Sequence, residues 1–130
     1  MKDAPDQHPA DALARLRDWM RRDLRTAMKA REPAIVSALR TTLAALDNAE
    51  AVEVPPEDGA LGGPVAGARA GVGSTEVARR TLSMDEVLGV LEEQITDRLA
   101  AADQYEALNR WSEAERLRQE GSVIRGYLPG

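Results

Sequence analysis

The sequence predicts an all-α protein, a four-helix bundle made of two antiparallel helical hairpins joined by a long Gly/Pro-rich linker. Three observations support this fold class. Apolar residues recur every three to four positions on both sides of residues 54–81, where Gly and Pro gather instead. The chain lacks Phe and has only two Trp and two Tyr, so its core must be aliphatic, which suits helices better than sheets. Its 130 residues are enough for one domain and too few for two ordinary ones.

The first hairpin is predicted from two apolar faces separated by a proline. Residues 1–10 are expected to be a disordered tail, and residues 11–130 to form the single domain. A first helix over residues 11–31 carries one apolar face, made of Leu13, Leu16, Met20, Leu24, Ala27 and Met28. Pro33 favours the first turn of a second helix, which runs to about residue 51. Because the connection is short, the two helices are expected to be antiparallel.

The second hairpin is expected to follow a flexible linker at about residues 54–81. Ser83 and Glu86 have the spacing of a capping box and predict that a third helix starts there. Its inward face consists of Met84, Val87, Leu88, Leu91, Ile95, Leu99 and Ala102. The helix should end near Asn109, a residue type that tolerates the left-handed conformation found just past helix ends. A fourth helix is expected over residues 111–127.

The residue inventory argues against several classes of function. There is no Cys, and the one His, His8, lies in the predicted tail, so thiolate chemistry and His-based acid–base catalysis have no scaffold. We therefore expect no catalytic residue, no cofactor and no metal. No apolar run approaches the ~20 residues of a membrane span, and the N-terminal residues have no signal-peptide pattern. The expected protein is cytoplasmic, without a membrane association.

Positive charge is concentrated on the first helix although the net charge of the chain is −5. At ~100° per residue, four cations fall within an arc of about 80° opposite the apolar face. These are Arg15, Arg22, Arg25 and Lys29. Two interpretations are open: a surface that follows nucleic-acid phosphates, or a solvated face partly paired with acidic neighbours. The acidic third helix decides between them, because it would neutralise the cations if it lay beside them.

Arg98 is the most unusual charged residue, since it falls within the apolar face of the third helix, between Leu91 and Ile95. An unpaired buried guanidinium is costly, so carboxylates are expected to meet it. The candidate partners are Asp23, Asp47 and Glu50. Arg40, at the edge of the second helix's apolar face, is expected to join the same network. This group is either a structural ion-pair network, which the sequence favours, or an anion-binding pair formed by Arg40 and Arg98.

Short motifs in a particular order resemble the helical part of the GatB/YqeY family. Residues 23–30 match a D-L-x-x-A-M-K-A pattern at the end of the first helix. The second helix carries the Leu-Arg pair at residues 39–40 and the Ala-Glu step at residues 49–50. Residues 94–98 offer an Ile…Arg segment, and residues 127–129 a Y-L-P ending. Family members commonly continue into a second small helical domain, similar to the tail that helps the amidotransferase B subunit hold tRNA; the sequence here ends at Gly130.

Three alternative functions remain, of which the resemblance implies the first two and exposed apolar helix surface the third. The first is a non-enzymatic helical adaptor that binds tRNA or a translation-related protein. The second is an accessory role in carbon–nitrogen ligation with glutamine as amide donor, in association with an amidotransferase. The third is a protein–protein interaction module that uses exposed apolar helix surface and no nucleic acid.

Overall fold

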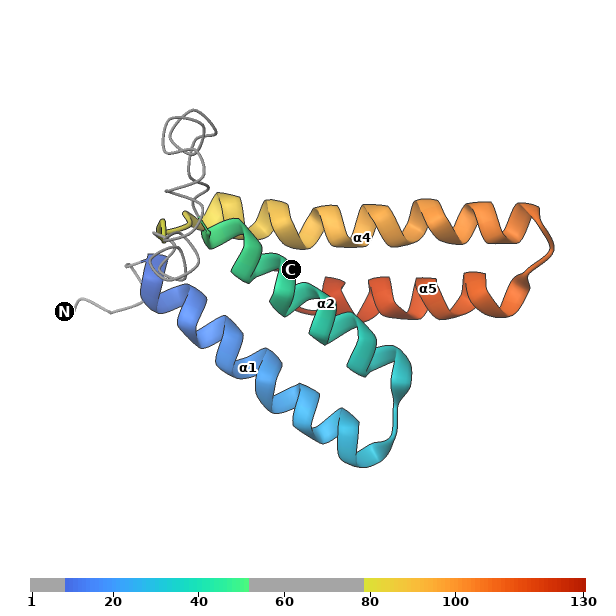
Figure 1. The fold of residues 1–130 in the computed structure, drawn as a ribbon, viewed down its shortest axis with the longest axis horizontal. Coiled ribbons are helices and arrows are strands. Elements are labelled where there is room, and N and C mark those ends of the chain that lie inside the picture. Colours follow the sequence, from blue (N-terminus) through green and yellow to red (C-terminus); the bar gives the residue numbers. More distant parts are fainter. Residues whose placement is uncertain (1–8, 52–78) are drawn as a thin grey trace, which may run out of the picture.

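The computed structural model describes residues 9–51 and 79–130, and within these ranges the chain is all-α. The helices are α1 (Pro9–Ala30), α2 (Pro33–Glu50), α4 (Met84–Ala107) and α5 (Trp111–Arg125) (Figure 1). Residues 1–8 of the predicted tail and residues 54–78 of the predicted linker lie outside the described residues. The tail prediction was two residues too long, because Pro9 and Ala10 belong to α1. Pro is well tolerated there, since the first turn of a helix needs no backbone donor.

The α1–α2 hairpin turns within two residues. Arg31 has a φ of 57°, and Glu32 donates a backbone hydrogen bond of 3.0 Å to the carbonyl of Ala27. A left-handed residue just past a helix end closes the last turn and reverses the chain. Pro33 then occupies the start of α2, as expected from its fixed φ. The two helices are therefore antiparallel neighbours (Figure 1).

The start of α4 is built by local sequence. The Ser83 hydroxyl accepts a hydrogen bond from the Glu86 amide, and the Glu86 carboxylate accepts one from the Ser83 amide, which confirms the predicted capping box. Leu82, just before the cap, is 1% exposed and joins the same core as Val87. This is the arrangement of a hydrophobic staple, which fixes the direction in which the chain enters a helix. The burial of Leu82 was not predicted, because this residue precedes the N-cap and lies outside the apolar periodicity of the helix.

The end of α2 contacts the residues that precede α4. Arg80 donates a backbone hydrogen bond of 2.9 Å to the carbonyl of Glu50, and Ala51 forms an isolated antiparallel bridge with Arg79. Arg79 and Arg80, predicted to be linker, thus lie against the end of α2.

The α4–α5 hairpin extends along the long axis of the molecule (Figure 1). Its turn contains Asn109 with a φ of 61°, and the Arg110 amide donates 2.8 Å to the carbonyl of Tyr105. The turn lies at one end of the long axis, beyond the α1–α2 pair (Figure 1). Leu108 and Trp111 at this tip are 68% and 58% exposed.

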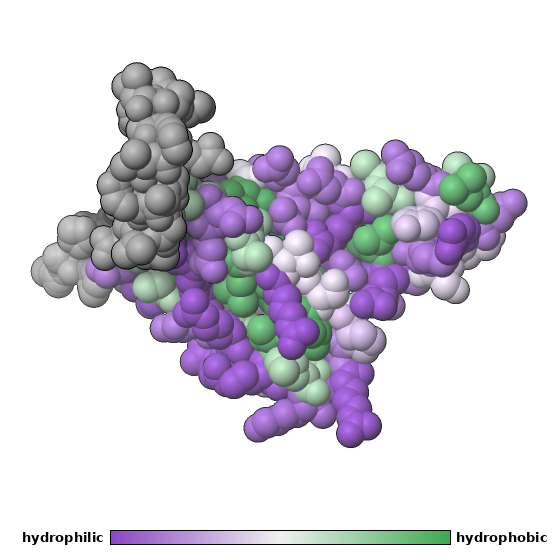
Figure 2. Space-filling model, viewed as in Figure 1, coloured by the Kyte–Doolittle hydropathy of each residue, from purple (hydrophilic) through white to green (hydrophobic). Residues whose placement is uncertain are grey.

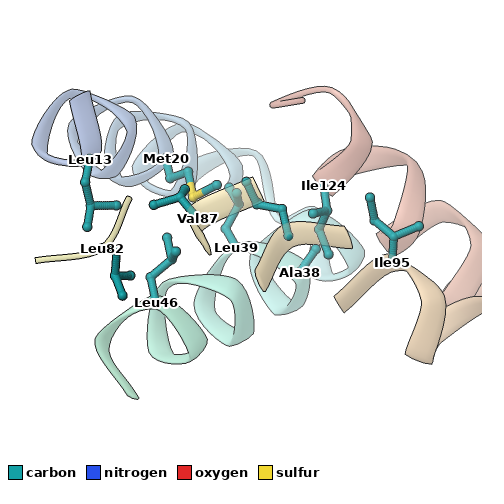
Figure 3. Close-up of a cluster of buried hydrophobic side chains, with 10 residues drawn as sticks. Leu13, Met20, Ala38, Leu39, Leu46, Leu82, Val87, Ile95 and Ile124 are labelled. Atoms are coloured by element: carbon teal, nitrogen blue, oxygen red, sulfur yellow. The ribbon is translucent and has the colours of Figure 1, made fainter. Parts of the chain in front are cut away.

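The core lies where the two hairpins meet (Figure 3). Its buried members are Leu13, Met20, Ala38, Leu39, Leu46, Leu82, Val87, Leu91, Ile95 and Ile124. Three residues predicted to point inward are instead substantially exposed, namely Met28, Met84 and Leu99. The α1–α2 pair is inclined to the α4–α5 pair (Figure 1), so the apolar faces are not covered along their whole length. Periodicity alone cannot show where a face loses its partner.

Candidate functional site

The basic side of α1 is the most conspicuous charged surface in the described residues. Arg15, Arg22, Arg25 and Lys29 are all exposed. Within the described ranges, the side chains of Arg22, Arg25 and Lys29 form no ion pair. The second half of α1 contains a single acidic residue, Asp23, whose carboxylate accepts a hydrogen bond from Tyr127. Figure 2 shows hydrophilic side chains along this part of the molecule.

The acidic residues of α4 that form ion pairs do so with arginines outside α1. Asp103 and Glu106 pair with Arg118 of α5, and Glu86 pairs with Arg80. In the part of the chain that the structure describes, no ion pair joins α1 to α4. The packing that would neutralise the basic face is thus not observed there. Within α1 itself, Asp18 forms an ion pair with Arg21 at 3.8 Å, one turn before the second half of the helix.

Arg17 holds an ion-pair network that the sequence analysis missed. Its Nη2 atom lies 2.8 Å from Asp47 Oδ1 and 2.8 Å from Glu50 Oε1, so it links α1 to the end of α2. The hydrogen bond from Arg17 is the main cause of the lowered pKa of Glu50. Arg79 adds a second contact to Glu50, at 3.1 Å. The detectable signal was the position of Arg17, which falls four residues after Leu13 on the apolar face.

Arg98 is buried, at 8% exposure, but its carboxylate partner is not among those predicted. Its Nε donates 2.9 Å to Oε1 of Glu120 on α5, and its Nη1 donates 2.9 Å to Oε1 of Gln94. The predicted partnership of Arg98 with Asp23, Asp47 and Glu50 is therefore wrong. Those carboxylates face α1 or Tyr127, because α4 packs mainly along α5 and turns Arg98 toward it.

Arg40 does not join Arg98, and this prediction is also wrong. It is exposed, and its Nη2 lies 3.8 Å from the sulfur of Met28 on α1. The edge of the apolar face of α2 on which Arg40 lies is turned to solvent. The second cation near Glu120 is Arg116, whose Nε lies 3.3 Å from Glu120 Oε2.

Asp23 and Tyr127 connect two segments that carried the sequence motifs. The Tyr127 hydroxyl donates a hydrogen bond to the Asp23 carboxylate, and the Tyr127 ring packs edge-on against Trp19 with centroids 4.5 Å apart. Burial, followed by the hydrogen bond to Asp23, raises the pKa of Tyr127 well above its usual value of 10.0. The Y-L-P segment is thus docked on the D-L-x-x-A-M-K-A segment of α1.

Two classes of site have no candidate in the described ranges. There, no group of three or more His, Cys, Asp or Glu residues is placed to hold a metal ion. None of the described helices has the length and apolar character needed to cross a membrane.

Comparisons with known proteins identify one family. No curated protein matches the chain. The family described as YqeY-like protein matches residues 65–130, a segment that includes α4, its capping box and α5 with the Y-L-P ending. The match covers half of the sequence. The chain belongs to the YqeY-like protein family.

Proposed function

We propose that this protein is a non-enzymatic helical adaptor that binds the phosphate backbone of a structured RNA, tRNA being the first candidate, through the basic side of α1. The observation that carries the proposal is the exposure of Arg22, Arg25 and Lys29 without an ion-pair partner in the described residues. Clustered cations of this kind release counterions from a nucleic acid, which supplies affinity without reading sequence.

The charge distribution supports this proposal although the chain as a whole is acidic. The anionic residues Asp103 and Glu106 lie on the far half of α4 and are paired with Arg118. Asp47 and Glu50 are paired with Arg17. The negative charges near the α1–α2 hairpin are thus partly compensated within the fold, whereas the cations on the outer side of α1 remain available for a ligand. A local field of this kind matters more for binding than the net charge does.

A titration with tRNA at several salt concentrations tests the proposal. We expect binding that weakens steeply with salt, with Arg22→Glu and Lys29→Glu each lowering the affinity. Each charge removed should reduce the logarithmic salt slope by about one. The matched control is Arg110→Glu, which changes the net charge equally but lies at the α4–α5 tip. Absence of binding at low salt, or equal weakening by the control, contradicts the proposal.

A second function is supported by the tip of the α4–α5 hairpin. Leu108 and Trp111 are exposed there, and the Arg110 guanidinium lies 5.5 Å from the centre of the Tyr105 ring. Figure 2 shows hydrophobic residues at this end of the molecule. Trp, Tyr and Arg are the residue types that most often dominate protein–protein interfaces. If the tip binds a protein, Trp111→Ser should abolish that complex and leave tRNA binding unchanged.

A further inference from the structure

A groove lies on the surface between α2 and α5 and is separate from the basic side of α1. It has a volume of about 390 Å³ and lies beside the first turns of α2. Its lining consists of Pro33, Val36, Ser37, Arg40, Thr41 and Arg116. The groove therefore combines two guanidinium groups with two hydroxyl groups, and no carboxylate lines it.

The position of Arg116 is determined by contacts on both sides. Its Nε donates to Glu120 Oε2 at 3.3 Å, and its Nη2 donates to the carbonyl of Pro33 at 3.3 Å. The bond to Pro33 joins α5 to the start of α2, the bond to Glu120 lies within α5, and together they hold the guanidinium plane in place. Its side chain is nevertheless 48% exposed, so part of this donor group faces solvent in the groove.

The charged groups behind Arg116 leave positive charge that no carboxylate compensates. Glu120 is one carboxylate shared by two arginines, because Oε1 accepts from Arg98 and Oε2 accepts from Arg116. Two guanidinium groups against one carboxylate leave a net charge of +1 in this cluster. Arg40 adds a second positive charge, and in the described residues its only polar contact is the Met28 sulfur. The acidic residues Glu32 and Glu115 line the adjoining groove and not this one.

We infer that this groove is a binding site for a phosphoryl group. Two positive charges match a dianion. The donors come from two helices and from the Ser37 hydroxyl, whereas the Thr41 hydroxyl donates to the Ser37 carbonyl at 2.8 Å. Such a set can reach the several oxygens of a tetrahedral oxyanion, whereas a planar carboxylate is already satisfied by one guanidinium. The bound species is either a small phosphate or the terminal phosphate of a nucleic acid. The inference does not depend on RNA binding by α1.

A titration of the full chain with inorganic phosphate at constant ionic strength tests the site. We expect saturable shifts of the Ser37 and Thr41 amide signals in NMR spectra, with a dissociation constant in the millimolar range. Arg40→Gln should weaken phosphate binding about tenfold or more, because a charge-assisted hydrogen bond is lost. Arg116→Lys keeps the charge but loses the two-sided geometry, and should weaken it as well. Arg125→Gln, an exposed residue of α5 outside the lining of the groove, is the control and should leave phosphate binding unchanged.

A second comparison identifies the source of the phosphate. An RNA oligonucleotide with a 5′-phosphate is compared with the same oligonucleotide carrying a 5′-hydroxyl. Tighter binding of the phosphorylated form, abolished by Arg40→Gln, assigns the site to a nucleic-acid end; equal binding assigns it to small phosphates. Either result requires the inorganic phosphate titration to succeed. If phosphate gives no saturable shift, or if Arg40→Gln binds it as well as the natural chain does, the inference is overturned, whatever tRNA does.

Discussion

The hydroxyl of Tyr127 donates a hydrogen bond to the carboxylate of Asp23, across 104 residues of sequence. The contact joins the residues after α5 to the middle of α1, and the Tyr127 ring packs against Trp19 beside it. The hydrogen bond also engages Asp23, which is the one acidic residue in the second half of α1. A residue pair with a structural role therefore leaves the neighbouring cations available on the outer side of the helix.

Removing the Tyr127 hydroxyl should destabilise the fold. Tyr127→Phe keeps the ring contact with Trp19 but deprives the partly buried Asp23 carboxylate of its donor. Hydrogen bonds to charged groups contribute about 1.5–3 kcal/mol, and we expect a loss of this order in the free energy of unfolding. Urea denaturation at pH 7 measures it. Tyr105→Phe is the matched control, because within the described residues the Tyr105 hydroxyl forms no hydrogen bond; an equal loss in both variants would refute the assignment.

The same hydroxyl predicts how stability depends on alkaline pH. The pKa of Tyr127 is raised in the folded state, so its neutral form is favoured by folding. This contribution is fully present below the unfolded-state pKa of about 10, and it is lost as the pH rises above that value. Between pH 9 and pH 11 the natural chain should therefore lose more stability than Tyr127→Phe. Parallel stability curves for the two proteins would contradict this prediction.

The buried ion pair should be sensitive to the removal of either partner, and more so to the loss of Glu120. Glu120→Ala leaves Arg98 buried without a carboxylate, which typically costs about 3–5 kcal/mol. Arg98→Met leaves Glu120 paired with Arg116 and should cost less. The double variant Arg98→Met with Glu120→Leu should recover much of the loss, since apolar replacements of buried pairs are often neutral. Chemical denaturation of all three variants, with exposed Glu115→Gln as control, decides the point.

Acid should weaken the link between α1 and α2. The pKa of Glu50 is lowered in the folded state by its hydrogen bond with Arg17. The stability that this pair supplies is present above the unfolded-state value of about 4.5, and it is lost as the pH falls below it. Glu50→Gln should therefore show a shallower loss of stability between pH 5 and pH 3. Glu92→Gln, an exposed change outside any described ion pair, should follow the natural chain.

A glycine in the middle of α4 offers a stabilising change. Gly89 is exposed, and a Cβ atom added there would meet nothing within 4 Å. Gly89→Ala should raise the free energy of unfolding by about 0.8–1 kcal/mol through helix propensity alone. Gly121→Ala on α5 should also be tolerated, since its Cβ would lie 3.7 Å from Leu99 Cδ2, an ordinary contact distance. A lower melting temperature for Gly89→Ala would show that the helix there is not as described.

Most of the helical architecture could be predicted from the sequence because its causes are local. The recurrence of apolar residues, the Ser83–Glu86 capping box and the fixed φ of Pro33 each act within a few residues. The cations on one side of α1 could be predicted for the same reason, because their placement depends only on the periodicity of that helix. The exposed side chains of Met28, Met84 and Leu99 were not predictable, since exposure depends on where a neighbouring helix ends.

The sequence by itself determined which segments are helical, where α2, α4 and α5 begin, and which faces are apolar or charged. Only the tertiary structure decided which charges meet: Arg98 with Glu120, Arg17 with Asp47 and Glu50, and Asp23 with Tyr127. The physical reason is that an ion pair depends on an approach of about 3 Å between side chains from different helices. A small rotation of one helix changes its partners without changing its own periodicity.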